Sequence, residues 1–173
     1  MSDKHLSHPS VLHVVACLEA AAHPHGVIAL ADSARSAAEA AAALSDETGT
    51  VVETGAIVKT LMFMAGDPEE PVIALVAGDR QCDVAALAVC AGSATSCRRP
   101  DAAAVKAATG YAIGGVSPIG LPEGIQVFMD SSLTRFAVVW AAAGHPHCVF
   151  KAAPTALATL AGATMTDEIA IAG

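Results

Sequence analysis

The sequence predicts a mixed α/β domain in which a largely antiparallel sheet is flanked by helices. Strand-like apolar runs follow one another through the second half of the chain, with few strand–helix–strand patterns between them. Alanine-rich segments with helical spacing lie between the other runs. A length of 173 residues fits one domain, spanning 1–173, and buries about 70% of the surface that the unfolded chain exposes.

The predicted helices follow from the spacing of apolar residues and from capping residues. Val11, Val14 and Leu18 recur at helical spacing in the first helix. We expect Ser33 to cap the second helix and Asp101 to cap the fourth. The predicted helices are 7–22, 34–44, 83–91, 101–108 and 154–160.

The predicted strands are short apolar runs bounded by turn residues. The turn at 66–71 contains Gly, Asp and two prolines, and it predicts a hairpin between the second and third strands. Segment 45–49 is predicted to be a polar turn, and the tail 164–173 has only a weak pattern. The predicted strands are 27–31, 56–64, 72–77, 125–129, 136–141 and 148–152.

Composition restricts the classes of partner. Proteins that wrap a nucleic-acid backbone are usually basic, so a net charge of −8 argues against DNA and against binding along an RNA, but it allows a small phosphate site. No run of about 18 residues is apolar without interruption, and the start lacks the features of a signal peptide, so we expect a cytoplasmic protein without a membrane segment. Five cysteines without a C-x-x-C motif indicate reduced thiols.

Lys59 is the one charged residue of the apolar segment 56–64. Strand alternation places it on the same face as Ile57 and Leu61. The side chain can simply extend from an edge strand into solvent. Alternatively, it places a cation against a phosphate or a carboxylate, or it has a lowered pKa.

Segment 110–120 contains four glycines and a proline, which predicts a loop with special backbone conformations. The segment does not match a phosphate-binding loop and does not begin a dinucleotide-binding unit. It is either a tight structural connection or a loop whose backbone amides face a ligand.

Two His-Pro-His triplets, at 23–25 and 145–147, are candidates for a metal site, a polar pocket wall or surface loops. No clear acidic or cysteine partner accompanies them in the sequence. Asp130 follows a predicted strand, either as a cap or as an acid of the site. The sequence contains neither a G-x-S-x-G motif nor a catalytic cysteine signature, and Ser117 has no histidine near it in the chain.

Taken together, these segments resemble the prolyl-tRNA editing family, also called the YbaK or aminoacyl-tRNA synthetase-associated domain. The resemblance covers most of the chain, and the pair formed by the lysine strand and the G-x-x-x-P loop is its most specific part. The matching segments are 33–44, 55–61 (GAIVKTL), 71–78 (PVIALVAG), 109–120 (TGYAIGGVSPIG), 129–130 (MD) and 140–150 (WAAAGHPHCVF).

The resemblance implies a mostly antiparallel, barrel-like sheet and hydrolysis of the ester that joins a wrong amino acid to the 3′ end of a tRNA, often tRNA-Pro. It implies that Lys59 holds the 3′ end and that the glycine loop lines the reaction centre. The expected catalytic residues are Lys59, Gly114, Gly115, Ser117 and Pro118. The expected substrate-binding residues are Thr60, Asp130, Gly144, His145 and His147.

An aminoacyl ester is already activated, so no cofactor, metal or strong nucleophile is expected. On a chain too short to hold a synthetase, the resemblance implies a freestanding enzyme whose partners are the tRNA 3′ end and, in one interpretation, a synthetase. Ala142 and Val149 stand where some bacterial members carry a polar Ser and an Asp. The alternative is therefore a catalytically weak module that binds a tRNA end or a synthetase. A third hypothesis is a metal-dependent hydrolase that uses the His-Pro-His triplets.

Overall fold

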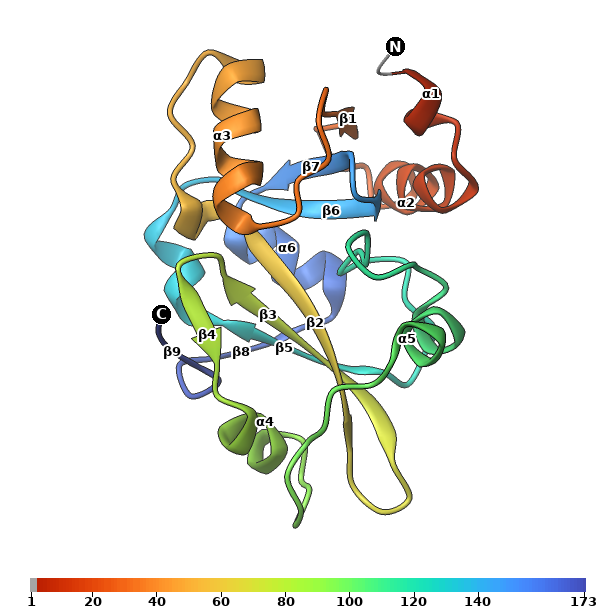
Figure 1. Cartoon of the computed structure of the whole chain (residues 1–173), viewed down its shortest axis with the longest axis vertical. Helices are drawn as coiled ribbons and strands as arrows, with labels where there is room; N and C mark the ends of the chain where they lie inside the picture. Colours follow the sequence, from red (N-terminus) through yellow and green to blue (C-terminus); the bar gives the residue numbers. More distant parts are fainter. Residues whose placement is uncertain (1–2) are drawn as a thin grey trace.

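The computed structural model describes residues 3–173 and contains three sheets (Figure 1). Met1 and Ser2, which belong to the predicted domain, lie outside the described residues. The largest sheet has the strand order β2-β3-β5-β8 and is mixed, because β2 and β3 are antiparallel while β5 runs parallel to both of its neighbours. Its strands are β2 (Val58–Ala65), β3 (Glu70–Ala77), β5 (Gln126–Asp130) and β8 (Thr164–Thr166).

The other two sheets are antiparallel. One has the order β1-β7-β6 and the other pairs β4 with β9. Their strands are β1 (Ile28–Ala29), β6 (Val139–His145), β7 (Cys148–Ala152), β4 (Arg80–Cys82) and β9 (Ala170–Ala172). Within residues 3–173 the sheets do not close on one another, so a mixed α/β fold is confirmed but a barrel-like sheet is not.

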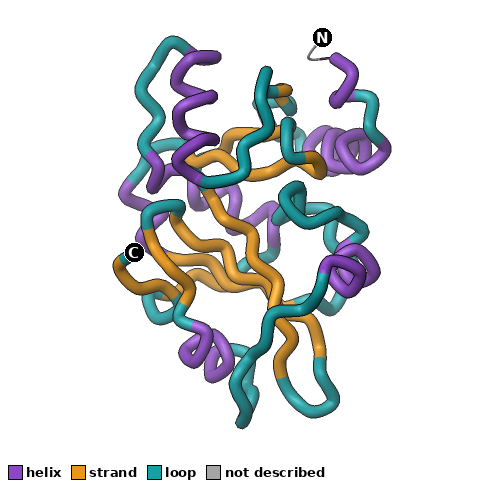
Figure 2. The backbone as a smooth tube through the Cα atoms, in the orientation of Figure 1, coloured by secondary structure: helices purple, strands orange, loops and turns teal. Residues whose placement is uncertain are grey.

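Six α-helices and two short 3-10 helices accompany the strands in the described part of the chain (Figure 2). The predicted helix 7–22 corresponds to α2 and is shorter at both ends, because Pro9 begins the helix and Ala20 ends it, whereas α1 was not predicted. The α-helices are α1 (Asp3–Leu6), α2 (Pro9–Ala20), α3 (Ala37–Thr48), α4 (Val84–Cys90), α5 (Ala102–Thr109) and α6 (Pro154–Ala161). The 3-10 helices are η1 (Thr54–Ala56) and η2 (Ser131–Arg135).

The predicted bounds of α3 were wrong at both ends. Ser36, rather than Ser33, is its cap, and Glu39 completes a capping box by accepting from the Ser36 N–H. The predicted polar turn at 45–49 forms the last turn of the helix instead. Ser45 donates a hydrogen bond to the carbonyl four residues back, and the helix ends where Gly49 adopts a φ of 67°.

Two further predictions at strand positions needed correction. The strand predicted at 136–141 begins only at Val139, because Phe136 closes η2 by donating its N–H to the Leu133 carbonyl. The weakly patterned tail forms β8 and β9, each of three residues, which are too short for alternation to be visible in the sequence.

β2 is an edge strand of the four-stranded sheet, and it runs from beside β6 down to the β2–β3 hairpin (Figure 1). Val58 and Met62 belong to the main apolar core, which α2, β6 and β7 share. Phe63 belongs to a second core that packs under α4. Successive β2 side chains therefore enter different layers of the molecule. None of the helices described for residues 3–173 is long and apolar enough to cross a membrane.

Candidate active site

A pocket of about 750 Å³ lies between the start of α3, the outer edge of β2, the loop at 113–116 and the β6–β7 turn. Five of the predicted site residues line it, namely Lys59, Thr60, Gly114, His145 and His147. The other five are not part of its lining, namely Gly115, Ser117, Pro118, Asp130 and Gly144. The fold thus brings the lysine strand, the glycine loop and the second His-Pro-His triplet to one place.

Both faces of β2 contribute to this pocket, because the strand forms the edge of its sheet. Lys59 and Leu61 lie on the face of Phe63, whereas Thr60 lies on the face of Val58 and Met62. The pocket therefore curves around the strand edge, with Lys59 on one side and Thr60 on the other.

The outer edge of β2 is unpaired along the pocket. An isolated bridge joins Ile57 to Trp140 at one end, and another joins Met64 to Arg98 at the other end. On this outer edge, no strand of the described residues pairs with the stretch between the two bridges, whereas β3 pairs with its inner edge. Unpaired strand edges expose backbone N–H and C=O groups, so this stretch offers hydrogen-bonding groups to a ligand.

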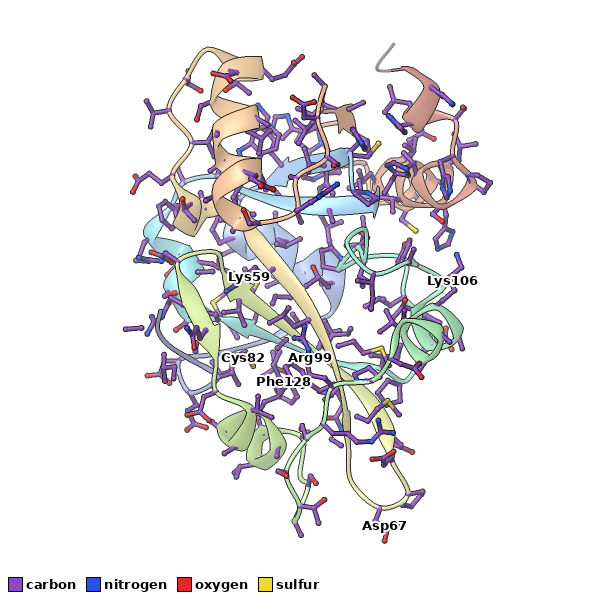
Figure 3. All side chains as sticks on the ribbon, in the orientation of Figure 1. Lys59, Asp67, Cys82, Arg99, Lys106 and Phe128 are labelled. Carbon is purple, nitrogen blue, oxygen red and sulfur yellow. The ribbon has the colours of Figure 1, made fainter. Side chains whose placement is uncertain are left out.

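The Lys59 side chain extends from β2 toward β4, where its ammonium group donates a hydrogen bond to the Arg80 carbonyl (Figure 3). Partial burial lowers the pKa of Lys59 below its usual value, and the nearby Asp79, Cys82 and Asp130 oppose this change. No described carboxylate forms a salt bridge with the ammonium group. Its positive charge therefore remains available to an anionic ligand.

Two more cations line the pocket, although the chain as a whole is acidic. Arg99 places its guanidinium 5.3 Å from the centre of the Phe63 ring, on the same side of β2 as Lys59. Arg35 lies before the start of α3. No Asp or Glu side chain among the described residues lines the pocket. This local excess of positive charge suits an anionic ligand such as a phosphate.

The glycine loop reaches the pocket through Gly114, which adopts a φ of 89°. Gly115 passes so close to β6 that an added Cβ would lie 2.8 Å from the His145 Cα. Only glycine allows this approach without movement of the backbone. The N–H of Gly115 donates to the Ala112 carbonyl, whereas those of Gly114 and Val116 have no hydrogen-bond acceptor among the described residues.

Ser117 and Pro118 lie beneath the loop and are buried. The Ser117 hydroxyl accepts a long hydrogen bond of 3.4 Å from the Ile119 N–H. The Tyr111 hydroxyl donates to the Ile119 carbonyl at 2.7 Å, and burial raises its pKa above the usual value. These contacts hold the base of the loop in place.

Asp130 and Gly144 also lie outside the pocket. The buried carboxylate of Asp130 caps η2 by accepting from the Ser132 N–H, and it accepts a further hydrogen bond from the Ala77 N–H. Gly144 sits in a β-bulge of β6 with a φ of 88°, and an added Cβ there would lie 2.6 Å from the Ser10 carbonyl oxygen. The bulge redirects the chain toward His145.

The two His-Pro-His triplets lie in different surroundings. His23 hydrogen-bonds the Lys151 carbonyl at 2.8 Å, and neither it nor His25 lines the pocket. His145 and His147 form part of the pocket wall. Among the described residues, no group of three or more His, Cys, Asp or Glu side chains is arranged to hold a metal ion.

The floor of the pocket is apolar. Ala142 and Val149 are cross-strand partners in β6 and β7, and both line the pocket beside Trp140. Cys148 also contributes to the lining, but its side chain is buried in the main apolar core, and burial raises the pKa of the thiol to about 11. Cys148 is therefore protonated at neutral pH and is a poor nucleophile.

Sequence reasoning missed Arg35, Arg99 and Trp140 as pocket residues. The Arg98-Arg99-Pro100 run was a usable signal, because two adjacent arginines before a proline are unusual in a chain with nine basic residues. The sequence does not reveal which arginine faces the pocket. Arg98 is paired with Glu69 instead.

The model of the aminoacyl-tRNA editing domain family matches residues 31–160. The sequence is 28% identical over 109 residues to a protein of Enterococcus faecalis, EbsC, which is named as a candidate Cys-tRNA(Pro)/Cys-tRNA(Cys) deacylase. This match covers 63% of the present chain and 65% of EbsC, slightly less than two thirds of that relative.

Two solved structures have closely similar folds. One is described as a candidate trans-editing enzyme for prolyl tRNA synthetase, with a TM-score of 0.79 and 33% identity, and the match covers 92% of this chain and 96% of that one. The other is the hypothetical protein APE2540, with a TM-score of 0.79 and 26% identity over 92% and 99% of the two chains. The predicted family resemblance is confirmed.

Proposed function

The chain belongs to the aminoacyl-tRNA editing domain family, and from this premise we propose that it hydrolyses the ester of a mischarged tRNA. The main support is the distribution of charge. The pocket gathers Arg35, Lys59 and Arg99 without a described carboxylate, in a chain whose net charge is −8. Such a site favours binding of the phosphates near a tRNA 3′ end. The rest of the protein is acidic, which disfavours contact along the tRNA body.

We assign the binding of the 3′ end to the cations beside β2. Lys59 and Arg99 lie on the same face of this strand, so a nucleotide placed along the unpaired edge meets both charges. The Lys59 ammonium group then exchanges its hydrogen bond with the Arg80 carbonyl for one to a phosphate or ribose oxygen.

We assign the stabilisation of the transition state to the glycine loop. During hydrolysis a water oxygen adds to the ester carbonyl carbon, the carbonyl oxygen becomes negative, and the bond to the ribose oxygen then breaks. The free amino acid leaves, and the ribose oxygen takes a proton. The N–H groups of Gly114 and Val116 have no other described acceptor, and they suit the role of donors to the developing oxyanion.

Thr60 is a candidate for positioning the substrate. Its Oγ1 is buried and has no hydrogen-bond partner among the described residues. Leaving a buried hydroxyl unpaired costs about 1–3 kcal/mol. A substrate oxygen or amino group that enters the pocket beside Thr60 would remove this cost.

We propose tRNA-Pro as the tRNA, with support from the names of the relative and of the solved structure, and we propose that hydrolysis occurs in trans. For the amino acid we propose a small, uncharged side chain. The apolar pair Ala142 and Val149 offers no hydrogen bond to a polar side chain.

The test is hydrolysis of a panel of mischarged tRNAs, with Lys59→Ala as the inactive variant and Arg98→Ala as a matched control that leaves the pocket intact. We expect the wild type and Arg98→Ala to release the amino acid from at least one tRNA well above the rate in buffer. Absence of hydrolysis for every tRNA of the panel would refute the proposal.

A second candidate function is a module that binds a tRNA end or a synthetase without hydrolysis. The apolar pair Ala142 and Val149 favours it, because this pair supplies no polar group to the reaction. In that case the wild type binds a tRNA 3′ end or a synthetase at micromolar concentration, and turnover is absent from the same panel.

A further inference from the structure

Four histidines from separate parts of the chain meet at the rim of the pocket. They are His5 on α1, His8 at the cap of α2, and His145 and His147 of the β6–β7 turn. The ring of His5 stacks on those of His145 and His147, with centroids 4.5 and 4.2 Å apart. The ring of His8 lies 5.3 Å from that of His145. We call these four residues the imidazole cluster.

Two hydrogen bonds of the imidazole cluster require an unprotonated ring nitrogen. The Nδ1 atom of His145 accepts from the His147 N–H at 3.1 Å, and that of His8 accepts from the Ser10 N–H at 3.2 Å. A nitrogen that accepts a hydrogen bond cannot carry a proton at the same time. Protonating either ring at Nδ1 therefore breaks the bond that orients it.

The charges around His5 and His145 also oppose protonation of these two rings. On α1 the neighbouring Lys4 is positive, and the loop at 113–116 has no titratable residue. The Leu30 carbonyl, which follows β1, accepts a hydrogen bond from Nδ1 of the His147 ring and adds no repulsion. Burial is the main cause that lowers the pKa of His5 and of His145, and the other histidines lower both further. No described carboxylate contributes to either change.

We propose that His5 is a positioning residue that holds the pocket-lining rings of His145 and His147, and that protonation of His5 and His145 releases α1 from the pocket wall. Stacked neutral rings attract one another, whereas several positive rings at these separations repel. The docked state is favoured above the usual histidine pKa of about 6.5, and release is favoured as the pH falls below it.

The proposal rests on the pocket wall and is independent of the reaction that the pocket performs. It is tested by proton NMR of the intact chain in the presence of a chelator, from pH 8 to pH 5. We expect contacts between the ring protons of His5 and His147 at neutral pH and their loss in acid. For each unit by which docking lowers a histidine pKa, acid changes the equilibrium between docked and released α1 about tenfold.

Two matched variants separate titration from packing. His5→Phe keeps an aromatic ring for stacking but cannot bind a proton, so we expect the contact between the introduced phenyl ring and the His147 ring to persist at pH 5. His25→Phe replaces an exposed histidine outside the imidazole cluster, and we expect the acid release of α1 to be the same as in the wild type.

Two results would overturn the proposal. One is persistence of the contact between His5 and His147 down to pH 5 in the wild type. The other is loss of the corresponding contact in His5→Phe over the same pH range as in the wild type, since this would show that the titration of His5 is irrelevant. Thermal unfolding of each variant at pH 7.5 confirms that the chain is folded in every comparison.

Discussion

On one face of β2, Lys59 lies with Leu61 and Phe63, and Arg99 covers the Phe63 ring. On the other face, Thr60 lies between Val58 and Met62, in the layer that holds Val116 of the glycine loop. The first face brings positive charge to the pocket, whereas the second brings backbone amides and apolar surface. Both faces of an edge strand can reach one pocket, so the strand supplies two chemically different walls of the site without a long insertion.

The largest effect is expected on the face of β2 that carries Lys59. Lys59→Met keeps most of the side-chain length but removes the ammonium group. We expect kcat/KM for a mischarged tRNA to fall roughly 10- to 100-fold, because a hydrogen bond to a charged group contributes about 1.5–3 kcal/mol.

The same variant should not lower the stability of the fold. Burial lowers the pKa of Lys59 in the folded state, so the folded protein disfavours the charge. The contribution of Lys59 to the free energy of unfolding therefore rises as the pH increases toward the usual lysine value, and at pH 7 the charge is unfavourable. A urea titration in which Lys59→Met loses stability at pH 7 would contradict this account.

The next largest effect is expected where the glycine loop meets β6. In Gly115→Ala, the new Cβ lies 2.8 Å from the His145 Cα, so loop and turn must move apart. We expect a loss of about 1–3 kcal/mol in urea unfolding, together with reduced hydrolysis. Gly26→Ala is the matched control, because its Cβ would meet nothing within 4 Å. Equal stability of the two variants would be evidence against this close approach.

A smaller effect is expected for Arg99, and the neighbouring Arg98 serves as its control. Arg99 lines the pocket, whereas Arg98 pairs with Glu69 outside it. We expect Arg99→Ala to weaken tRNA binding about three- to tenfold and to reduce the salt dependence of binding by about one counterion. We expect Arg98→Ala to change neither quantity. If the two variants weaken binding equally, the charge is not localised at the pocket.

The smallest effect is expected for the Thr60 hydroxyl, on the other face of β2. Thr60→Val removes the buried hydroxyl that has no described partner and keeps the shape of the side chain. We expect unchanged or slightly higher stability, because replacing an unsatisfied buried polar group is nearly neutral or stabilising. Hydrolysis should fall a few-fold if Thr60 positions the substrate. Lower stability with unchanged hydrolysis would remove Thr60 from the site.

Much of this site could be predicted because its parts are local in sequence. The apolar run around Lys59 and the glycine loop each have a strong composition signal, and both line the pocket through Lys59 and Gly114. The sequence does not show which β2 side chains lie on the side of the glycine loop, because this depends on β2 being an edge strand. That position results from pairings between distant parts of the chain.

The remaining differences also have physical causes. Ser33 and Ser36 are both suitable caps, and only the Glu39 carboxylate at the correct spacing selects Ser36. The parallel pairing of β3 with β5 joins segments that are far apart in the chain, and no local pattern encodes it. Arg99 follows the bridge between Met64 and Arg98, and these two residues are separated in the sequence by β3, β4 and α4.

The most direct test of the site is a crystal structure of the chain with a non-hydrolysable amide analogue of an aminoacylated CCA end. We expect a phosphate or ribose oxygen within hydrogen-bond distance of Lys59, and the carbonyl oxygen of the analogue facing the N–H groups of Gly114 and Val116. Binding of the analogue elsewhere, for example in the open groove beside His13 and Lys106, would contradict this expectation.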